Sequence, residues 1–396
     1  MKKLLQINIC VNKWSTGRIV EQIGLSAMSH GWESFVIYGN SMNPSKSRLI
    51  KVGPKLNKYL HYIEQRIFDN EGLCSRFLTK RIVKKIEAIK PDIIHLHNIH
   101  DHYINYRILF QYLNQTEIKV VWTFHDCWAF TGHCFHFVTK DCTRWMDVCH
   151  NCPLSHDDPD TLFDRSRENF LLKKQLFSSN KNLTIVPCSE WLGNFVRSSF
   201  LKDKRIEIIR NGVDISLYSP SRPKLSAKSN EFNILAVSSV WQKSKGLYDI
   251  FELRRILPHE YIITMVGLND SQLKEIPQGI VGVKRTSNIQ ELVDLYSSSD
   301  VLINPTYADT FPTINLEALA CGTPVITYKT GGSPEAIDGK TGIVIEQGDV
   351  VALANALMNM KNNPYSPVDC RKRAVDFFDK DKCFKKYVDL YEQLLG

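Results

Sequence analysis

The chain has 396 residues, of which 43% are hydrophobic and 23% are charged, with 20 glycines and 16 prolines. This composition excludes a disordered, collagen-like or coiled-coil chain, and the length predicts two domains because one hydrophobic core rarely grows beyond about 250–300 residues. The net charge of +8, from 50 basic and 42 acidic residues, favours an anionic partner: a phosphate-bearing small molecule, an acidic membrane surface or nucleic acid.

Short apolar runs rich in valine and isoleucine recur along the chain, and a stretch of helical pattern follows each of them. Because most of these runs lack polar alternation, they are typical of strands buried on both faces of a parallel sheet. The first series comprises residues 4–10, 34–38, 92–97, 119–125 and 183–188, and the second comprises 206–209, 233–240, 262–267, 280–283, 301–304, 324–328 and 343–345. The polar, proline-punctuated stretch 219–230 separates the two series, so we place the domain junction in or just before it.

The pattern predicts an α/β protein of two doubly wound domains, with ligands bound at the carboxyl ends of the strands and in the cleft between the domains. We expect an N-terminal domain at residues 1–200 with a cysteine-rich insertion at 127–159, a C-terminal domain at 201–375, and a terminal helix at 376–396 that packs across both. No apolar run reaches the ~18–20 residues of a spanning helix, and the first ten residues are typical of a strand rather than a secretory signal. We therefore expect a cytoplasmic protein.

Segment 304–328 combines a strand end, a loop and a predicted helix. Pro312 suits the first position of this helix, and Gly322 suits its C-terminal cap. The free backbone N–H groups and the dipole of a helix start attract anions. A diphosphate is therefore expected at Thr313 and Ile314.

Two carboxylates lie near this helix start. Glu317 is one turn into the helix, where it could accept hydrogen bonds from the vicinal hydroxyls of a ribose, and Asp309 is in the preceding loop, where it could bind other hydroxyls. The alternative is an ordinary junction between a loop and a helix, with both acids exposed.

Asp309, followed after seven residues by Glu317-Ala-Leu-Ala-Cys-Gly-Thr-Pro-Val-Ile, resembles the carboxylate–x7–glutamate signature of family 4 retaining glycosyltransferases. The common form of that signature has glutamate at the position of Asp309. Further matches occur in the expected order at Ile209–Pro220, which contains Asn-Gly-Val-Asp, at Lys245-Gly-Leu, and at Tyr328–Glu335, which contains Gly-Gly. The nearest subgroup resembles enzymes that build capsular polysaccharides of the colanic-acid kind.

This resemblance implies a GT-B fold, in which two Rossmann-like domains face a cleft and a C-terminal helix crosses back. It implies a hexosyl- or related glycosyltransferase that moves a sugar, with retention, from a nucleoside-diphosphate sugar in the second domain to a glycan acceptor, expected to be lipid-linked, in the first. Exopolysaccharide, capsule or lipopolysaccharide assembly is the implied setting, and no catalytic divalent metal is implied. Lys245, Asp309 and His125 are assigned to catalysis, and donor contacts to Gly17, Lys243, Lys245, Phe311, Thr313, Ile314 and Glu317.

The chain departs from the family pattern at two places. The family usually has an arginine five or six residues before its Lys-Gly pair, but Ser239 and Val240 stand there, so the second phosphate cation is Lys243 or a basic residue from elsewhere. The first-domain loop, usually glycine-rich, is segment 12–18 here, and only Gly17 could let the backbone approach a ligand closely.

His125 and Asp126 follow a predicted strand, at the sheet edge that faces the cleft by the topology rule. In isolation a buried, satisfied histidine is the alternative. The resemblance places a histidine here beside the transferred sugar, so we assign His125 to the sugar and the transition state, and Asp126 to orienting it or to the acceptor. We interpret the histidine-rich run 95–102 as lining of the cleft, with His97 as an acceptor contact, rather than as a metal cluster.

Four cysteines have the spacing of a structural zinc site. In Cys134-x7-Cys142-x6-Cys149-x2-Cys152, the Cys-x2-Cys turn binds one metal and two further thiolates complete a tetrahedron. A long insertion with few aliphatic residues also needs a cross-link, such as a bound metal ion, to become ordered. We expect one structural zinc ion; free thiols and disulfides are the alternatives.

The helical stretch 55–90 is the most basic part of the chain, with cations that include Lys80, Arg81, Lys84 and Lys85 among apolar residues. A solvated surface is the usual explanation. Exposed apolar residues among the cations would instead suit an anionic membrane surface, so we expect peripheral association with the inner face of the cell membrane.

Other functions remain open. The same fold could serve a sugar-nucleotide epimerase or a non-catalytic glycan-binding protein, although Asp309, Glu317 and Lys245 speak against an inactive site. The cysteine spacing and positive charge would also suit a zinc-containing nucleic-acid-binding protein. No recognition helix or aromatic RNA-binding strand is visible, so we expect no nucleic-acid partner.

Overall fold

The computed structural model describes residues 1–157, 159–221 and 231–396. The chain forms two compact units, one of Met1–Arg210 together with Phe384–Gly396, and one of Asn211–Cys383. Most of the predicted junction, residues 222–230, lies outside the described residues. Among those that are described, no helix combines the length and the apolarity that crossing a bilayer requires.

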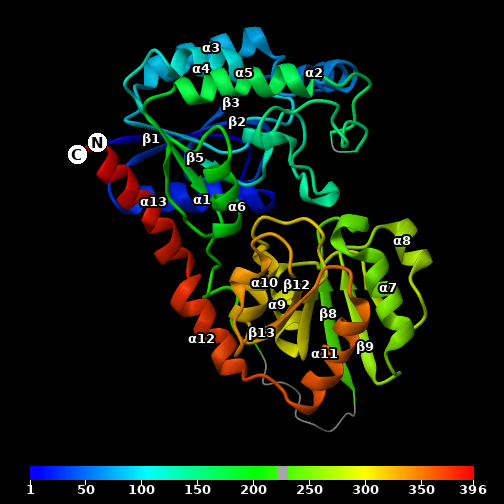
Figure 1. Ribbon diagram of the computed structural model, residues 1–396. Helices are drawn as coiled ribbons and strands as arrows, with labels where there is room; N and C mark the ends of the chain where they lie inside the picture. The colour runs from blue at the N-terminus through cyan, green and yellow to red at the C-terminus, as the bar shows by residue number, and fades with distance from the viewer. Residues whose placement is uncertain (158, 222–230) are drawn as a thin grey trace. The chain divides into compact units, whose positions relative to one another are not determined.

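The first unit is built on a parallel sheet that has, within the described residues, seven strands in the order β3-β2-β1-β4-β5-β6-β7. Its strands are β1 (Lys3–Val11), β2 (Glu33–Met42), β3 (Arg48–Lys51), β4 (Ile93–Leu96), β5 (Lys119–Phe124), β6 (Leu183–Pro187) and β7 (Arg205–Ile206). Its helices are α1 (Trp14–Ser29), α2 (Lys55–Phe68), α3 (Arg76–Ile89), α4 (Tyr106–Leu113), α5 (Ser166–Ser179) and α6 (Glu190–Ser198). Helices α2 to α5 cover one face of the sheet, and α1 and α6 cover the other (Figure 1).

The second unit contains a parallel sheet with, among the residues described, six strands in the order β10-β9-β8-β11-β12-β13. Its strands are β8 (Phe232–Val237), β9 (Tyr261–Val266), β10 (Ile280–Val283), β11 (Val301–Asn304), β12 (Val325–Tyr328) and β13 (Gly342–Ile345). Its helices are α7 (Leu247–Ile256), α8 (Asp270–Glu275), α9 (Ile289–Ser298), α10 (Thr313–Ala320), α11 (Val350–Asn362) and α12 (Pro367–Phe377), and the last helix of the chain is α13 (Lys380–Leu395). Both sheets are doubly wound, which confirms the expected fold class.

Most predicted strands are present within one or two residues at each end, although β2 continues to Met42 and β8 ends at Val237. Two further strands differ in kind. Strand β3 was not expected, because Arg48-Leu-Ile-Lys51 is too short and polar-flanked to stand out as a buried run. The run 206–209 was grouped with the second series, yet it contributes to β7, which pairs with β6 of the first sheet. A strand of two residues carries too little local pattern to indicate which sheet it joins.

Helix α13 supplies part of the first unit's core. Its Phe384, Tyr387, Val388 and Tyr391 are buried in a cluster that also contains residues of α1 and of the strands, and each such side chain removed from water stabilises the fold by roughly 1.5–3 kcal/mol. The expectation that segment 376–396 packs across both domains stays a prediction.

Candidate active site

In the second unit, three loops follow neighbouring strands at the same edge of the sheet. A 3-10 turn at Lys243–Lys245 follows β8, the loop 305–312 leads from β11 to α10, and a Gly-Gly loop follows β12. Because β8, β11 and β12 are adjacent and parallel, their carboxyl ends meet, which is where ligands of such sheets bind.

Lys245 and Asp309 form an ion pair at this edge. The Lys245 Nζ lies 2.8 Å from Asp309 Oδ2 and donates a second hydrogen bond to the Ala308 carbonyl at 3.0 Å. Both side chains remain partly exposed, at 30% and 25%. The two loops are also joined through their backbones, since the Tyr307 N–H donates to the Ser244 carbonyl at 2.8 Å. The structure therefore holds a cation and a carboxylate together at a surface that a ligand can reach.

Two glycines allow these loops to approach each other. Gly246 has a φ of 73°, and a Cβ atom there would lie 2.2 Å from the Pro305 carbonyl oxygen. Gly331 has a φ of 56°, and its Cβ would lie only 1.6 Å from the Asp309 carbonyl oxygen. Left-handed backbone and lack of space together require glycine at both positions.

The predicted helix start is present as the beginning of α10, with one correction, and its binding of an anion stays a prediction. Pro312 is the residue that precedes the helix, with extended backbone at φ −68° and ψ 119°, rather than its first helical residue, and it provides no capping side chain. The first N–H groups of an α-helix, here those that begin with Thr313 and Ile314, have no intrahelical partner. Phe311 is buried just before this helix, and its N–H donates to Asp309 Oδ1 at 3.3 Å.

A buried polar network that the sequence did not reveal supports this helix start. The Asn304 side-chain amide donates to Asn315 Oδ1 at 2.9 Å, and the Asn315 amide donates to Ser333 Oγ at 2.9 Å. These bonds connect β11, α10 and the turn after β12. They fix the first turn of α10 relative to the sheet.

Glu317 is 8% exposed, which does not fit the alternative of two solvent-exposed acids. The hydroxyl of the fully buried Tyr296, on α9, donates to Glu317 Oε2 at 2.9 Å. Burial and then the charge of Glu317 raise the pKa of Tyr296 well above its ordinary value, so the phenol remains a donor. Nothing in the local sequence pairs these two residues, which are 21 positions apart.

In the first unit, His125 follows β5 and His97 follows β4. The two rings contact through His97 Nδ1 and His125 Nε2 at 3.1 Å, and His97 Nε2 lies 3.2 Å from Gln6 Oε1 on β1. Burial lowers the pKa of His125 to about 4, so the imidazole is neutral near pH 7. His97 is only 1% exposed and lies behind His125 rather than at the surface, and its assignment as an acceptor contact stays a prediction.

Asp126 is held by His100 and by the backbone. Its Oδ2 lies 2.9 Å from His100 Nε2, and its Oδ1 accepts the Trp128 N–H at 2.9 Å. Burial alone would raise the pKa of Asp126, but His100 and this N–H outweigh it and lower the pKa to about 2. The carboxylate is therefore ionised and paired.

The last two predicted donor residues are Gly17, in the first unit, and Lys243, in the second. Gly17 belongs to α1, because the helix begins at Trp14 instead of leaving 12–18 as a loop. A Cβ atom at Gly17 would lie 2.9 Å from the Cys10 sulfur, so the backbone of Gly17 lies close to Cys10 on β1. Lys243 is exposed in the turn that contains Lys245.

The first unit also has a groove of about 880 Å³ beside the start of α1. Buried Ile9 lines it together with aromatic rings and polar side chains: Trp14, Thr16, Asn40, Lys58, Tyr59, Tyr62, Asn98, Asp101 and His102. Such a mixture of flat amphipathic rings and hydrogen-bonding groups suits a polar ligand with apolar faces.

Comparisons with known proteins point to one family. Residues 17–217 match the family described as Glycosyltransferase Family 4, and residues 231–363 match the family described as Glycosyl transferases group 1. The chain is 22% identical to a putative colanic acid biosynthesis glycosyl transferase, WcaC, of Escherichia coli (strain K12), over 99% of this chain and 100% of the relative. It is also 22% identical to a D-inositol 3-phosphate glycosyltransferase of Corynebacterium efficiens, over 86% of this chain and 80% of that protein.

Solved structures share the fold. Sucrose-phosphate synthase from Thermosynechococcus elongatus superimposes with a TM-score of 0.73 at 17% identity, covering 100% of this chain and 99% of that one. Anabaena Alr3699/HepE, solved in complex with UDP, superimposes with a TM-score of 0.67 at 14% identity, covering 99% of this chain and 100% of that one.

Proposed function

Because this chain belongs to glycosyltransferase family 4, we propose that it transfers a sugar, with retention of configuration, from a nucleoside-diphosphate sugar to a glycan acceptor in polysaccharide assembly. The chain is a glycosyltransferase with the GT-B fold and two Rossmann-like domains. Its full-length likeness to a colanic acid enzyme supports the polysaccharide setting, and the UDP and UDP-glucose complexes of the Anabaena structures support the donor class. Family membership favours this function over the epimerase, glycan-binding and nucleic-acid alternatives.

The observation that carries the proposal is the convergence of Lys245, Asp309, the start of α10 and Glu317 on one strand edge, which we call the donor site. The Lys245 ammonium and the helix N–H groups at Thr313 and Ile314 would stabilise the negative charge that grows on the departing diphosphate. Glu317, held by the Tyr296 hydroxyl, would accept the ribose hydroxyls. These groups position and neutralise the leaving group, so no carboxylate needs to attack the sugar.

In the first unit, His125 and the groove would bind the sugar and the acceptor. A neutral His125 ring can donate a hydrogen bond to a sugar hydroxyl, and the contact with His97 holds its orientation. The aromatic rings of Trp14, Tyr59 and Tyr62 would stack on the apolar faces of acceptor sugars. Asp126 stays ionised and can accept a hydrogen bond from a hydroxyl group of the glycan acceptor.

A lipid-linked acceptor would bring the enzyme to the inner face of the cell membrane, and the surface of α2 and α3 suits that location. Leu56 and Leu60 on α2 are 66% and 57% exposed, and Phe77 on α3 is 71% exposed. The α3 cations Lys80, Arg81, Lys84 and Lys85 are exposed as well. We propose that this membrane face, α2 with α3, binds an anionic bilayer through apolar insertion and charge together.

Titration calorimetry with UDP-, GDP- and ADP-sugars, combined with NMR assignment of the product anomer, tests the transferase proposal. One nucleotide class should bind more tightly than the others, and the product should keep the donor's anomeric configuration. Glu317→Gln and Tyr296→Phe should both weaken donor binding, whereas Tyr248→Phe, on an exposed tyrosine, should not. An inverted product, or unchanged donor affinity in Glu317→Gln, would contradict the assignment.

A further inference from the structure

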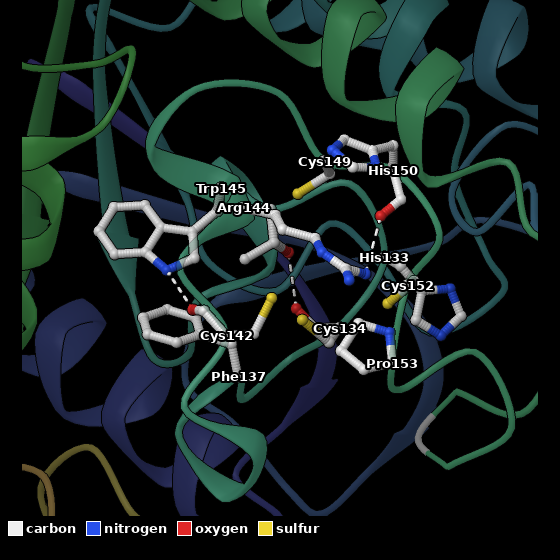
Figure 2. Close-up of a pocket in the computed structure, with 11 residues that line it drawn as sticks. His133, Cys134, Phe137, Cys142, Arg144, Trp145, Cys149, His150, Cys152 and Pro153 are labelled. Atoms are coloured by element: carbon white, nitrogen blue, oxygen red, sulfur yellow. Dashed lines mark hydrogen bonds between the residues drawn. The ribbon is translucent and has the colours of Figure 1, made fainter.

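The long connection between β5 and α5 gathers four cysteines around one small cavity. Cys134, Cys142, Cys149 and Cys152 all line it, and Figure 2 shows their side chains on its rim. The cavity has a volume of about 10 Å³, which is roughly the space of a single water-sized particle. All eleven cysteines of the chain are described, and each is a free thiol. We call residues 127–159 the cysteine loop.

A backbone N–H group is directed at one of these sulfurs, since the Gly132 N–H donates to Cys149 Sγ at 3.2 Å. Cys149 and Cys152 begin and end the Cys-x2-Cys turn. Between these two cysteines, Asn151 has a left-handed φ of 44°, which closes the Cys-x2-Cys turn. An N–H donor stabilises a thiolate more than a thiol, because the hydrogen bond to a charged acceptor is stronger. The Gly132 N–H is therefore placed to stabilise a thiolate at Cys149.

The backbone around the other cysteines is also fixed. Trp145 Nε1 donates to the Cys142 carbonyl at 3.0 Å, and Thr131 Oγ1 donates to the Cys134 carbonyl at 2.7 Å. Arg144 donates to the His150 carbonyl at 3.0 Å, inside the Cys-x2-Cys turn. Dashed lines in Figure 2 mark these three bonds. Each thiol is thus held within reach of the same cavity by its own local contacts.

Lys173, on α5, is a buried cation that needs a counter-charge nearby. It is 1% exposed and donates to the carbonyl oxygens of Trp128 and Thr131 at 2.8 and 3.1 Å, with its Nζ 3.6 Å from the centre of the Trp128 ring. Within the described part of the chain, it forms no ion pair with a carboxylate. A buried ammonium of this kind is costly unless it is compensated.

We propose that the cysteine loop binds one structural Zn²⁺ through the thiolates of Cys134, Cys142, Cys149 and Cys152. Four thiolates around a divalent ion form a tetrahedral centre with a net charge of −2 and Zn–S distances of about 2.3 Å, and that charge would balance Lys173. Binding displaces the four thiol protons to solvent. No group of three or more described side chains is already arranged as a metal site, so the sulfurs turn toward the centre of the cavity when the ion binds.

A fifth potential metal ligand, His133, lines the same cavity, and the experiment must distinguish it from the four cysteines. His133 Nδ1 lies 2.6 Å from Asp69 Oδ1, and its buried Nε2 has no hydrogen-bond partner in the structure. A carboxylate behind a histidine is the usual support for a metal-bound imidazole. The proposal nevertheless assigns four thiolates, so Cys142→Ser should lose the metal and His133→Gln should keep it. The reverse result would overturn the four-thiolate assignment.

Elemental analysis of full-length protein, prepared without a polyhistidine tag or chelator, tests the proposal directly. We expect close to one equivalent of zinc in the parent protein, most of it lost in Cys149→Ser, and all of it kept in Cys188→Ser, which changes a buried cysteine outside the loop. Cobalt substitution of the parent protein should produce the thiolate-to-cobalt charge-transfer absorption, which does not depend on whether a variant folds. Zinc below a tenth of an equivalent with four titratable thiols, or a mass that shows disulfides, would overturn the proposal. Because the readout is metal content, the result is independent of whether sugar transfer is detected.

Discussion

The donor site and the cysteine loop are both built at carboxyl ends of strands, but by opposite means. In the second unit, short loops after β8, β11 and β12 are held by the sheet itself, by close glycine contacts and by the Asn304–Asn315–Ser333 network. In the first unit, the connection after β5 has 3-10 turns but no strand among its described residues. Short loops at a sheet edge are positioned by the strands and by contacts with one another, whereas a long loop has too little regular structure for this and needs a cross-link.

The largest effect is expected at the donor site, from Lys245→Ala. Removing the ammonium leaves the charge on the departing diphosphate unbalanced, and contacts of this kind are typically worth ~10²–10³ in rate. The turnover number should therefore fall by about that factor, with a smaller change in donor affinity. Lys284→Ala removes a lysine whose only described ion pair is with exposed Asp270, and it serves as the control. Steady-state kinetics with both variants measures the difference, and equal activity would show that Lys245 does not contact the leaving group.

Removal of the metal should affect the cysteine loop and leave the donor site unchanged. Zinc extraction with a strong chelator should destabilise the first unit, because the binding free energy of a structural metal contributes directly to folding. Donor binding measured at low temperature should remain, because the donor site does not depend on the cysteine loop. Calorimetric unfolding with and without chelator provides the measurement, and re-addition of zinc should restore the transition. An unchanged transition would mean that the loop is ordered by its hydrogen bonds alone.

Gly331→Ala should damage the donor site through its backbone. The new Cβ would overlap the Asp309 carbonyl oxygen, and left-handed backbone costs a further ~1 kcal/mol or more for alanine, so the loop should shift at a total cost of about 1–3 kcal/mol. Gly339→Ala is the matched control, because a Cβ atom there would meet no other atom within 4 Å and the φ of Gly339 is not left-handed. Donor titration should show weaker binding in Gly331→Ala only, and equal affinity in the two variants would argue against contact between this loop and the donor.

The Asp126–His100 pair should make the first unit sensitive to acid. Because the pKa of Asp126 is lowered to about 2 from 3.8, its contribution of about 2 kcal/mol is present above pH 4 and is lost as the pH falls toward 2. The pKa of His100 is raised above 6.5, so its contribution is present below that pH and is lost as the pH rises through the raised value. Asp126→Asn should abolish the acid dependence and weaken the dependence due to His100, because Asp101 also raises the pKa of His100. Chemical denaturation at several pH values measures the slopes, and parallel slopes in parent and variant would contradict the pairing.

The effect that depends most on salt is expected at the membrane face. Replacing Lys80, Arg81, Lys84 and Lys85 by glutamate should weaken binding to anionic vesicles, since each surface cation contributes about 1 kcal/mol at low salt. The control reverses four exposed lysines elsewhere, at Lys181, Lys202, Lys340 and Lys386. Co-sedimentation with phosphatidylserine vesicles should separate the two variants at low salt and not at high salt. Equal binding by both would remove the proposal for α2 and α3.

The sequence by itself determined the local elements and the motifs they carry. The apolar runs predicted nearly all strands, the segment before Gly322 indicated a helix start suited to anions, and the cysteine spacing indicated a possible metal cluster. These features depend on neighbours within a few positions, since strand burial, helix capping and turn chemistry all act at that range.

Only the tertiary structure decided which distant residues meet. Lys245 and Asp309 are 64 positions apart, Tyr296 and Glu317 are 21 apart, and His97 contacts His125 because β4 and β5 are neighbours. The order of strands in each sheet also placed β7 in the first unit and brought Lys173 beneath the cysteine loop. Such contacts follow from how βαβ crossovers arrange the strands, and no pattern of nearby residues encodes that order.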